Sequence, residues 1–187
     1  MKSPRVLALA ILPLVLAACG TSEASTGAPL VPADPPAGWE SHAMGPVTLA
    51  APADWEEFET QPGDRADEAF ALRAAGEGPG TGVHTSVTSQ RTRDAAAAIE
   101  NLGSVGDASV GAEDVEQAEL TWPGAEAAGW IGYRATVTVG SEDVEMRYEY
   151  LVVDLEDDAQ AIVAVVAPAD TFDESGAHDV LASVTVG

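Results

Sequence analysis

The chain has 187 residues and a formal net charge of −23, because 31 acidic residues oppose only 8 basic ones. Such an acidic protein is not expected to bind nucleic acid or anionic lipid headgroups, since both kinds of binding require clusters of Lys and Arg. The sequence contains one cysteine, which excludes an internal disulfide, so the fold must be stabilised by its own hydrophobic core.

The N-terminus has the organisation of a secretory signal peptide. Lys2 and Arg5 precede an uncharged, mostly apolar run over residues 6–18, and small residues precede Cys19. The run is shorter than the roughly 20 apolar residues that a transmembrane helix requires, so a permanent span is the weaker interpretation. Removal of residues 1–18 would take away two positive charges and change the net charge from −23 to −25.

The residues around the only cysteine resemble the lipobox of bacterial lipoproteins, with the sequence Leu16-Ala17-Ala18-Cys19. The resemblance implies that the sulfur of Cys19 receives diacylglycerol and that acyl chains such as palmitate anchor the mature protein to the cell membrane, on its extracytoplasmic face. Two or three chains on one residue make such an anchor stable. The alternative is an ordinary signal peptide cut near Ala18, which would leave Cys19 as a free thiol.

Residues 19–38 are rich in Ser, Thr, Pro, Ala and Gly and show no hydrophobic periodicity. This composition predicts a disordered stalk between the anchor and the domain. Residues 39–187 are expected to form a single domain, which is long enough to bury a core.

The elements of the domain are predicted from apolar and polar alternation and from the turn residues between the segments. Strands are expected over residues 47–51, 70–75, 83–91, 115–122, 129–139, 142–155, 161–167 and 183–186. A helix is expected over residues 94–102, with Asp94 as its N-cap and Gly103 at its end. A second helix is expected to begin at Thr171, which has the capping-box spacing to Glu174.

Two features of these strands predict their arrangement. Residues 129–139 and 142–155 should pair as a long antiparallel hairpin with one polar face. Residues 161–167 are apolar at every position, which predicts a central strand covered on both faces. The order of the elements predicts an α+β fold, an antiparallel sheet flanked by helices.

Three short segments resemble a known family. They are VTLAAPADW at residues 47–55, WPGAEAAGW at 122–130 and VLASVTV at 180–186. Over about residues 44–186 the chain resembles actinobacterial lipoproteins of the LpqN type and, beyond them, proteins of the Mog1/PsbP-like fold. The resemblance implies an α/β/α sandwich around an antiparallel sheet and a role as a binding or accessory module, with no catalytic motif.

Motifs for catalysis or cofactor binding are incomplete. His42, His84 and His178 are far apart and lack the spacing of a zinc site, so they are interpreted as a chance trio, with His84 facing solvent. Ser104 lacks the glycine that a nucleophile elbow has two positions earlier, and it is expected in the loop after the first helix. No cofactor is therefore expected.

Clusters of acidic residues were weighed as calcium ligands. They lie over residues 113–116, 142–145 and 154–158, but the twelve-residue calcium loop with its central glycine is missing. The clusters are interpreted as solvated turns or faces. The glycines of residues 76–82 do not form a phosphate loop either, because no lysine follows and the segment joins two strands.

Tryptophans are the candidate contacts to a ligand or partner, because exposed indoles anchor partners. Trp122 is interpreted as core. Trp130 is predicted to share a sheet face with Arg134, so either a helix covers that face or the indole is available to a ligand, and core packing is the preferred interpretation. Trp130, Arg134 and Trp39 are the candidate contact residues.

The sequence therefore predicts an exported, lipid-anchored and non-enzymatic binding or accessory module of the bacterial cell envelope. Its partner would be an envelope protein or a lipid or cell-wall ligand. The alternative is an envelope hydrolase whose carboxylates converge only in the fold. Two carboxylates in a deep cleft, one with a raised pKa, would favour that alternative.

Overall fold

The computed structural model describes residues 29–60, 66–76 and 80–187. Within these residues the chain forms two antiparallel sheets, two α-helices and two short 3-10 turns, so the predicted α+β composition is confirmed. Neither α-helix has the length and apolar character needed to cross a bilayer. The predicted signal peptide and Cys19 lie outside the described residues.

The larger sheet has seven strands in the order β3-β4-β5-β9-β8-β7-β6. The strands are β3 (Trp55–Glu57), β4 (Glu68–Ala74), β5 (Gly82–Thr88), β6 (Glu113–Leu120), β7 (Ala127–Val139), β8 (Glu142–Asp154) and β9 (Gln160–Pro168). Every neighbouring pair is antiparallel. The predicted hairpin of residues 129–139 and 142–155 is confirmed as β7 with β8, and β4 pairs with β5 in another hairpin. Strand β9 is the fourth of the seven and therefore central, as predicted.

A second, three-stranded sheet has the order β1-β2-β10. It consists of β1 (Trp39–Met44), β2 (Val47–Pro52) and β10 (Thr185–Val186). The prediction of a single sheet was wrong at this point. The reason is that β2 pairs with β1 and with the C-terminal β10, so the two ends of the domain form a sheet of their own.

Helix α1 (Ala95–Val110) begins as predicted, since Asp94 accepts a hydrogen bond from the backbone N–H of Ala97. Its predicted end at Gly103 was wrong, because the helix continues to Val110 and stops at the left-handed Gly111. Gly103 is buried against the sheet instead. A Cβ atom built there would lie 3.1 Å from the Ile131 side chain, so this glycine permits close packing and does not end the helix.

The second predicted helix is broken in two. A 3-10 turn, η2 (Phe172–Glu174), comes first, and helix α2 (Ala177–Ala182) follows after Gly176, which has a φ of 77°. The predicted capping box is absent, because the Thr171 side chain makes no capping hydrogen bond. Another 3-10 turn, η1 (Glu156–Asp158), joins β8 to β9.

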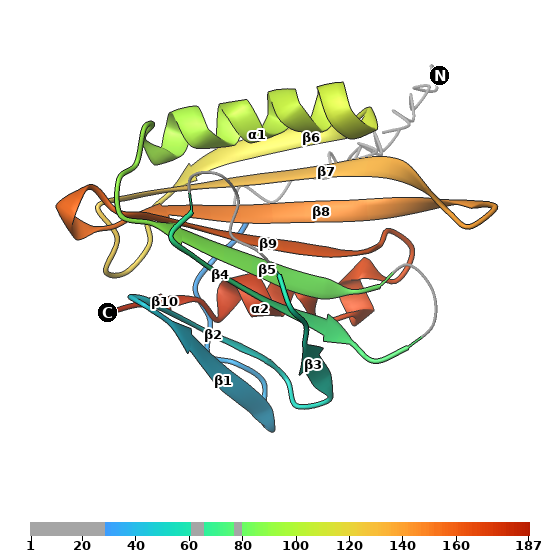
Figure 1. The fold of residues 1–187 in the computed structure, drawn as a ribbon, viewed down its shortest axis with the longest axis horizontal. Helices are drawn as coiled ribbons and strands as arrows, with labels where there is room; N and C mark the ends of the chain where they lie inside the picture. Colours follow the sequence, from blue (N-terminus) through green and yellow to red (C-terminus); the bar gives the residue numbers. More distant parts are fainter. Residues whose placement is uncertain (1–28, 61–65, 77–79) are drawn as a thin grey trace, which may run out of the picture.

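The two faces of the large sheet are covered differently (Figure 1). Helix α1 packs over β6, β7 and β8 on the α1 face, while α2 and the small sheet pack on the opposite, α2 face. The larger core lies on the α2 face and includes Leu49, Leu151 and Val163, whereas the smaller core under α1 includes Ile99 and Ile131.

The two faces of strand β9 are buried to different extents. Val163 and Val165 are buried on the α2 face, but Ile162, Ala164 and Val166 are only half-buried on the α1 face. The prediction that this strand is covered on both faces was therefore wrong for the α1 face, because α1 covers the β6 side of the sheet.

The predicted stalk is also shorter than expected. Residues 30–33 dock on the domain, and the Leu30 side chain is 2% exposed in the larger core. The backbone N–H of Ala33 donates to the carbonyl of Ala182 at 2.8 Å. The folded domain thus includes residues before Trp39, because a proline-rich composition does not exclude docking of one apolar side chain.

Candidate functional site

Among the described residues no helix covers the α1 face over β4, β5 and β9, because α1 packs over β6, β7 and β8 (Figure 1). The strand register places His84 opposite Ala164, and Ala164 opposite Tyr150. Val166 lies opposite Tyr148 in the same way. Directly paired residues point to one face of a sheet, so these side chains share the open area.

A groove of about 550 Å³ occupies this open area. Its floor consists of small and aliphatic residues of β5 and β9, among them Gly82, Ala164 and Val166. Aromatic side chains stand at its sides: Tyr148 on β8, and Phe58, which is 38% exposed, after β3. Ligand pockets of about 300–1,000 Å³ with a mainly apolar lining are typical of small-molecule sites.

Tyr148 and Tyr150 line the side of the groove next to α1, and Tyr133 supports them. The ring of Tyr133 stacks on Tyr148 and Tyr150, with centroids 5.2 and 5.8 Å apart. The hydroxyls of Tyr133 and Tyr150 are 3.0 Å apart and share a hydrogen bond. Burial raises the pKa of Tyr148 and of Tyr150, so both hydroxyls stay neutral at physiological pH. This side of the groove is therefore uncharged.

The charge at the groove comes from Arg73. Its guanidinium lies 5.8 Å above the ring of Phe58, at the edge of the groove. Glu56 is the cross-strand neighbour of Arg73, yet no ion pair of Arg73 occurs among the described residues. Burial lowers the pKa of His84, which is therefore neutral at pH 7. The groove thus combines an apolar floor with one permanent cation among its described lining residues.

A second polar cluster surrounds Glu149 on the α2 face. Its carboxylate is completely buried, and its Oε2 lies 2.7 Å from Nδ1 of His178 on α2. Nε and Nη2 of Arg147 both donate to Oε1, at 3.0 and 2.6 Å. Trp130 donates its indole N–H to Oε2 at 3.4 Å. One buried carboxylate therefore joins His178 and Trp130, which are far apart in the sequence.

The partners of Glu149 control its ionisation. Burial alone would raise the pKa of Glu149, but the hydrogen bonds and positive charges of His178 and Arg147 outweigh burial and lower the pKa. The hydrogen bond to Glu149 in turn raises the pKa of His178. A buried carboxylate that is fully paired and has a lowered pKa is suited to holding α2 on the sheet, and a general acid needs the opposite shift.

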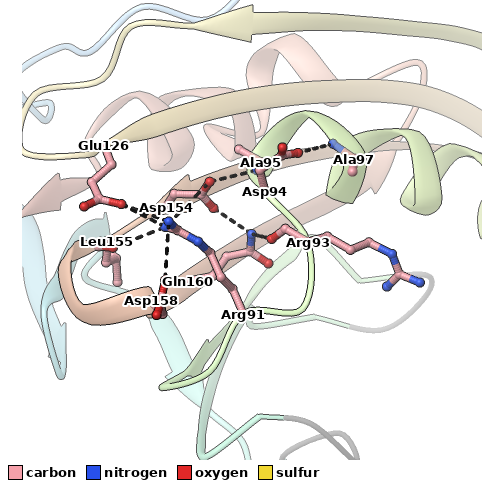
Figure 2. A network of polar contacts seen from close by, with 10 residues as sticks. All are labelled: Arg91, Arg93, Asp94, Ala95, Ala97, Glu126, Asp154, Leu155, Asp158 and Gln160. Carbon is pink, nitrogen blue, oxygen red and sulfur yellow. Dashed lines mark hydrogen bonds and ion pairs between the residues drawn. The ribbon is translucent and has the colours of Figure 1, made fainter.

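Asp154 from the third acidic cluster is at the centre of a network that fixes the start of α1 (Figure 2). Its two carboxylate oxygens accept hydrogen bonds from the backbone N–H of Ala95 and from Nε2 of Gln160, at 3.0 and 2.7 Å. Arg91 approaches Asp154 at 3.8 Å and donates to Glu126 at 3.0 Å. These contacts tie the β8–β9 hairpin to α1, which explains why Asp154 is buried.

The predicted contact residues do not come together as one surface. Trp130 is 2% exposed and belongs to the core, so the preferred interpretation is confirmed and a role as an exposed anchor is wrong. Trp39 is half-buried, and its ring packs against Gly176. Arg134 is 46% exposed and lies 3.6 Å from Asp114. Cys19 lies outside the described residues.

The remaining expectations are corrected in part. His84 lines the groove and is half-buried, so its predicted exposure to solvent was wrong. Ser104 is inside α1, where its hydroxyl donates to the carbonyl of Glu100 at 3.0 Å, and not in a loop. Among the described residues, no group of three or more His, Cys, Asp or Glu is placed to hold a metal ion.

The groove was not identified from the sequence. Residues 148 and 150 alternate with charged residues, and residues 161–167 are apolar throughout, so the sequence contains both signals. The missing information was the length of sheet that α1 covers. Strand β9 is apolar on both faces, so its α1 face becomes an exposed apolar area wherever α1 does not cover it.

Comparisons with known proteins do not assign the chain to a family. No family model matches the chain, and no curated protein matches it. The resemblance to LpqN-type lipoproteins therefore stays a prediction from short motifs.

Proposed function

We propose that this protein is an exported lipoprotein, anchored through Cys19 to the extracytoplasmic face of the cell membrane. Its domain would bind a small amphiphile and would not catalyse a reaction. The single observation that carries the binding role is the apolar groove of about 550 Å³ on the open half of the α1 face.

The chemistry of the groove favours a ligand with an apolar body and an anionic end. Ala164 and Val166 offer an apolar floor, and Tyr148 offers a ring for stacking. Arg73 lies at the edge, where a guanidinium can hold an anionic group in bidentate geometry. In a chain with a net charge of −23, an anionic ligand needs such a local cation to offset long-range repulsion.

The short segment between Cys19 and Pro29 supports a role close to the membrane. The first residue that the structure describes is Pro29, which is ten residues after Cys19. Ten residues span at most about 35 Å when fully extended, so an anchored domain would stay within about that distance of the bilayer. A ligand taken from the membrane or the cell wall would therefore be within reach, whereas an envelope protein as the partner is the alternative.

We also propose that the fold is the Mog1/PsbP-like sandwich. The support is the antiparallel sheet with α1 on one face and α2 on the other. The competing proposal of an envelope hydrolase gains no support from the described carboxylates, since the two with a shifted pKa, Asp67 and Glu149, are both shifted downward.

The groove can be tested with 1-anilinonaphthalene-8-sulfonate, a fluorescent probe with an apolar body and an anionic end. We expect saturable fluorescence with the full-length protein at neutral pH, displaced by a single-chain fatty acid. Replacing Ala164 with Phe fills the floor of the groove and should abolish the signal. Replacing Arg73 with Gln should weaken binding about tenfold, the effect of losing one charge-assisted hydrogen bond.

The matched control is Val105→Phe, which adds a ring of the same kind at a 50% exposed position on α1 and outside the groove lining. It should bind the probe as the parent does. Equal fluorescence in the parent and in Ala164→Phe would contradict binding in the groove. Thermal melts of all variants exclude probe binding to unfolded protein.

The anchor is tested by replacing Cys19 with Ser, which removes the sulfur nucleophile but keeps the apolar run. We expect export to continue and membrane retention to be lost when the gene is expressed in a bacterium that makes lipoproteins. Mass spectrometry of the parent protein should show a lipid-modified cysteine as the first residue. An unmodified Cys19, or equal retention of the two forms, would leave an ordinary secreted domain.

A further inference from the structure

A second hollow, of about 390 Å³, lies at β6, β7 and β8, away from the amphiphile groove. Its polar lining includes Asp114 and Glu116 of β6, Arg134 of β7 and Arg147 of β8. Arg147 contacts the buried Glu149, which places this end of the hollow on the α2 face. The hollow is therefore independent of the groove, which lies on the α1 face.

The two arginines face each other across neighbouring strands. Arg134 and Arg147 are direct partners in the β7–β8 register. Like charges directly opposite each other destabilise a strand pair. The chain has only 8 basic residues against 31 acidic ones, so placing two of them opposite each other demands an explanation. Glu149 and Asp114 offset part of this repulsion, and a bound anion between the arginines would offset more of it.

Arg147 is held in a fixed orientation. Two of its nitrogens donate to Oε1 of Glu149, and its guanidinium lies 4.8 Å above the ring of Phe172. Both supporting side chains are buried, with Glu149 completely inaccessible and Phe172 2% exposed. Nη1 of Arg147 makes no hydrogen bond within the described part of the chain, and the side chain is 32% exposed. The arginine is thus preorganised to donate outward.

Arg134 is held loosely by comparison. Its Nη1 lies 3.6 Å from Asp114, beyond hydrogen-bond distance, and the side chain is 46% exposed. Asp114 has a left-handed φ of 52° and lies at an irregularity in the β6–β7 register between Glu113 and Glu116. Bulges of this kind redirect a side chain. Asp114 is therefore a weak internal partner that an incoming anion could replace.

Gly132 lines the hollow together with the two arginines. It lies opposite Glu149, and the ring of Trp130 covers its backbone, 2.7 Å from the position of a Cβ atom. A larger residue could not occupy this position without moving Trp130. The absence of a side chain thus lets the Trp130 ring pack against the wall of the hollow.

We propose that this hollow binds a phosphate group between the guanidinium groups of Arg134 and Arg147. Arginine matches phosphate oxygens through paired N–H donors, and one fixed and one adjustable arginine can hold two sides of the group. The phosphate is either inorganic or the terminal group of a larger molecule. The acidic residues Asp114 and Glu116 limit the site to a small anion and oppose extended polyanions.

Isothermal titration of the full-length protein in non-ionic detergent, at low ionic strength, tests this site with inorganic phosphate. We expect saturable binding that Arg134→Gln weakens about tenfold, as expected for a lost charge-assisted hydrogen bond. Asp114→Asn removes the competing carboxylate and should tighten binding severalfold. Arg93→Gln removes an exposed arginine outside the hollow and should leave the affinity unchanged.

The Nε–H resonance of Arg134 in a nitrogen-15 spectrum gives a second readout, which should shift with phosphate and saturate at the same concentration. Tighter binding of glycerol 1-phosphate than of inorganic phosphate would assign the group to a larger molecule, and equal binding would assign it to free phosphate. No saturable binding would overturn the proposal. Equal losses in Arg134→Gln and Arg93→Gln, or weaker binding by Asp114→Asn, would overturn it as well, since they indicate diffuse attraction.

Discussion

Nδ1 of His178 lies 2.7 Å from Oε2 of Glu149, so a six-residue helix near the C-terminus is joined to the large sheet through a carboxylate with no exposed surface. The same helix contacts the segment before β1, because the carbonyl of Ala182 accepts a hydrogen bond from the backbone N–H of Ala33. Helix α2 is therefore held by the large sheet at one point and by residues before β1 at another.

Stability should depend on pH in two directions. The pKa of His178 is raised above 6.5, so its contribution is fully present below pH 6.5 and is lost as pH rises through the raised value. The pKa of Glu149 is lowered below 4.5, so its contribution is present above pH 4.5 and is lost as pH falls through the lowered value. Arg147 and Asp179 are the other charges acting on His178.

We therefore expect the pair to contribute most between about pH 4.5 and 6.5, as measured by the thermal midpoint across a pH series. His178→Gln should remove the decline that begins above pH 6.5. Because His178 is 39% exposed, solvent screens the effect and the decline should be small. The same decline in the parent and the variant would show that other groups cause it.

Replacing Glu149 with Gln should destabilise the protein by about 2–3 kcal/mol, because Arg147 and His178 lose their charged partner. Both remaining cations are partly exposed, so the cost should be below the 3–5 kcal/mol typical of a fully buried unpaired charge. Urea unfolding measures the difference. Glu145→Gln, at an exposed position of the same strand, should change stability by less than about 0.5 kcal/mol.

The segment before β1, which contains Leu30, should contribute to the stability of the domain. Leu30→Ala is expected to cost about 2–4 kcal/mol, because the side chain is 2% exposed in the larger core. Val31→Ala, next to it but 58% exposed, is the matched control and should be nearly neutral. Chemical denaturation of both variants measures their free energies of unfolding. Equal stabilities would mean that residues 29–38 behave as the stalk predicted from composition.

The central strand should not tolerate a charge. Val163→Asp places a carboxylate at a position with no exposed surface in β9, where it costs several kcal/mol and should prevent soluble expression. Val139→Asp, near the tip of the β7–β8 hairpin and 40% exposed, makes the same chemical change at the surface. If Val163→Asp expressed and melted like Val139→Asp, the strand order given for the large sheet would be incorrect.

Gly106→Ala should destabilise the protein, although replacing glycine with alanine in a helix usually stabilises it. Alanine inside a helix normally stabilises it by about 1 kcal/mol relative to glycine. At Gly106, however, the new Cβ atom would lie 3.0 Å from Cζ of Tyr133, whose ring is held between Tyr148 and Tyr150. We expect a loss of about 1 kcal/mol or more from this overpacking.

Ser109→Ala, at an exposed position of the same helix, is the control for helix propensity and should be neutral or slightly stabilising. A gain in stability from Gly106→Ala in a thermal melt would show that Tyr133 can move. Probe binding in the groove should then change too, because Tyr133 supports the tyrosines on its side.

Local signals in the sequence determined most of the strands. Alternation fixed the faces of β7 and β8, the turn residues separated the hairpins, and a continuous apolar run identified the central β9. Asp94 marked the beginning of α1 for the same reason, because a cap acts on backbone atoms only a few residues away. The charge balance and the residues around Cys19 likewise required no tertiary structure to interpret.

Tertiary structure decided what covers each face, and with it the candidate sites. A periodic pattern reports which side of an element is apolar, but it does not report which distant element packs there or how far that element extends. Gly103 indicated a helix end from sequence, although the sheet opposite made it a packing residue. His178 lies 29 residues from Glu149, and the groove exists because α1 covers only part of its face. Of the candidate contact residues named from the sequence, Arg134 lines a hollow, which it forms with residues of β6 and β8 that come together only in the fold.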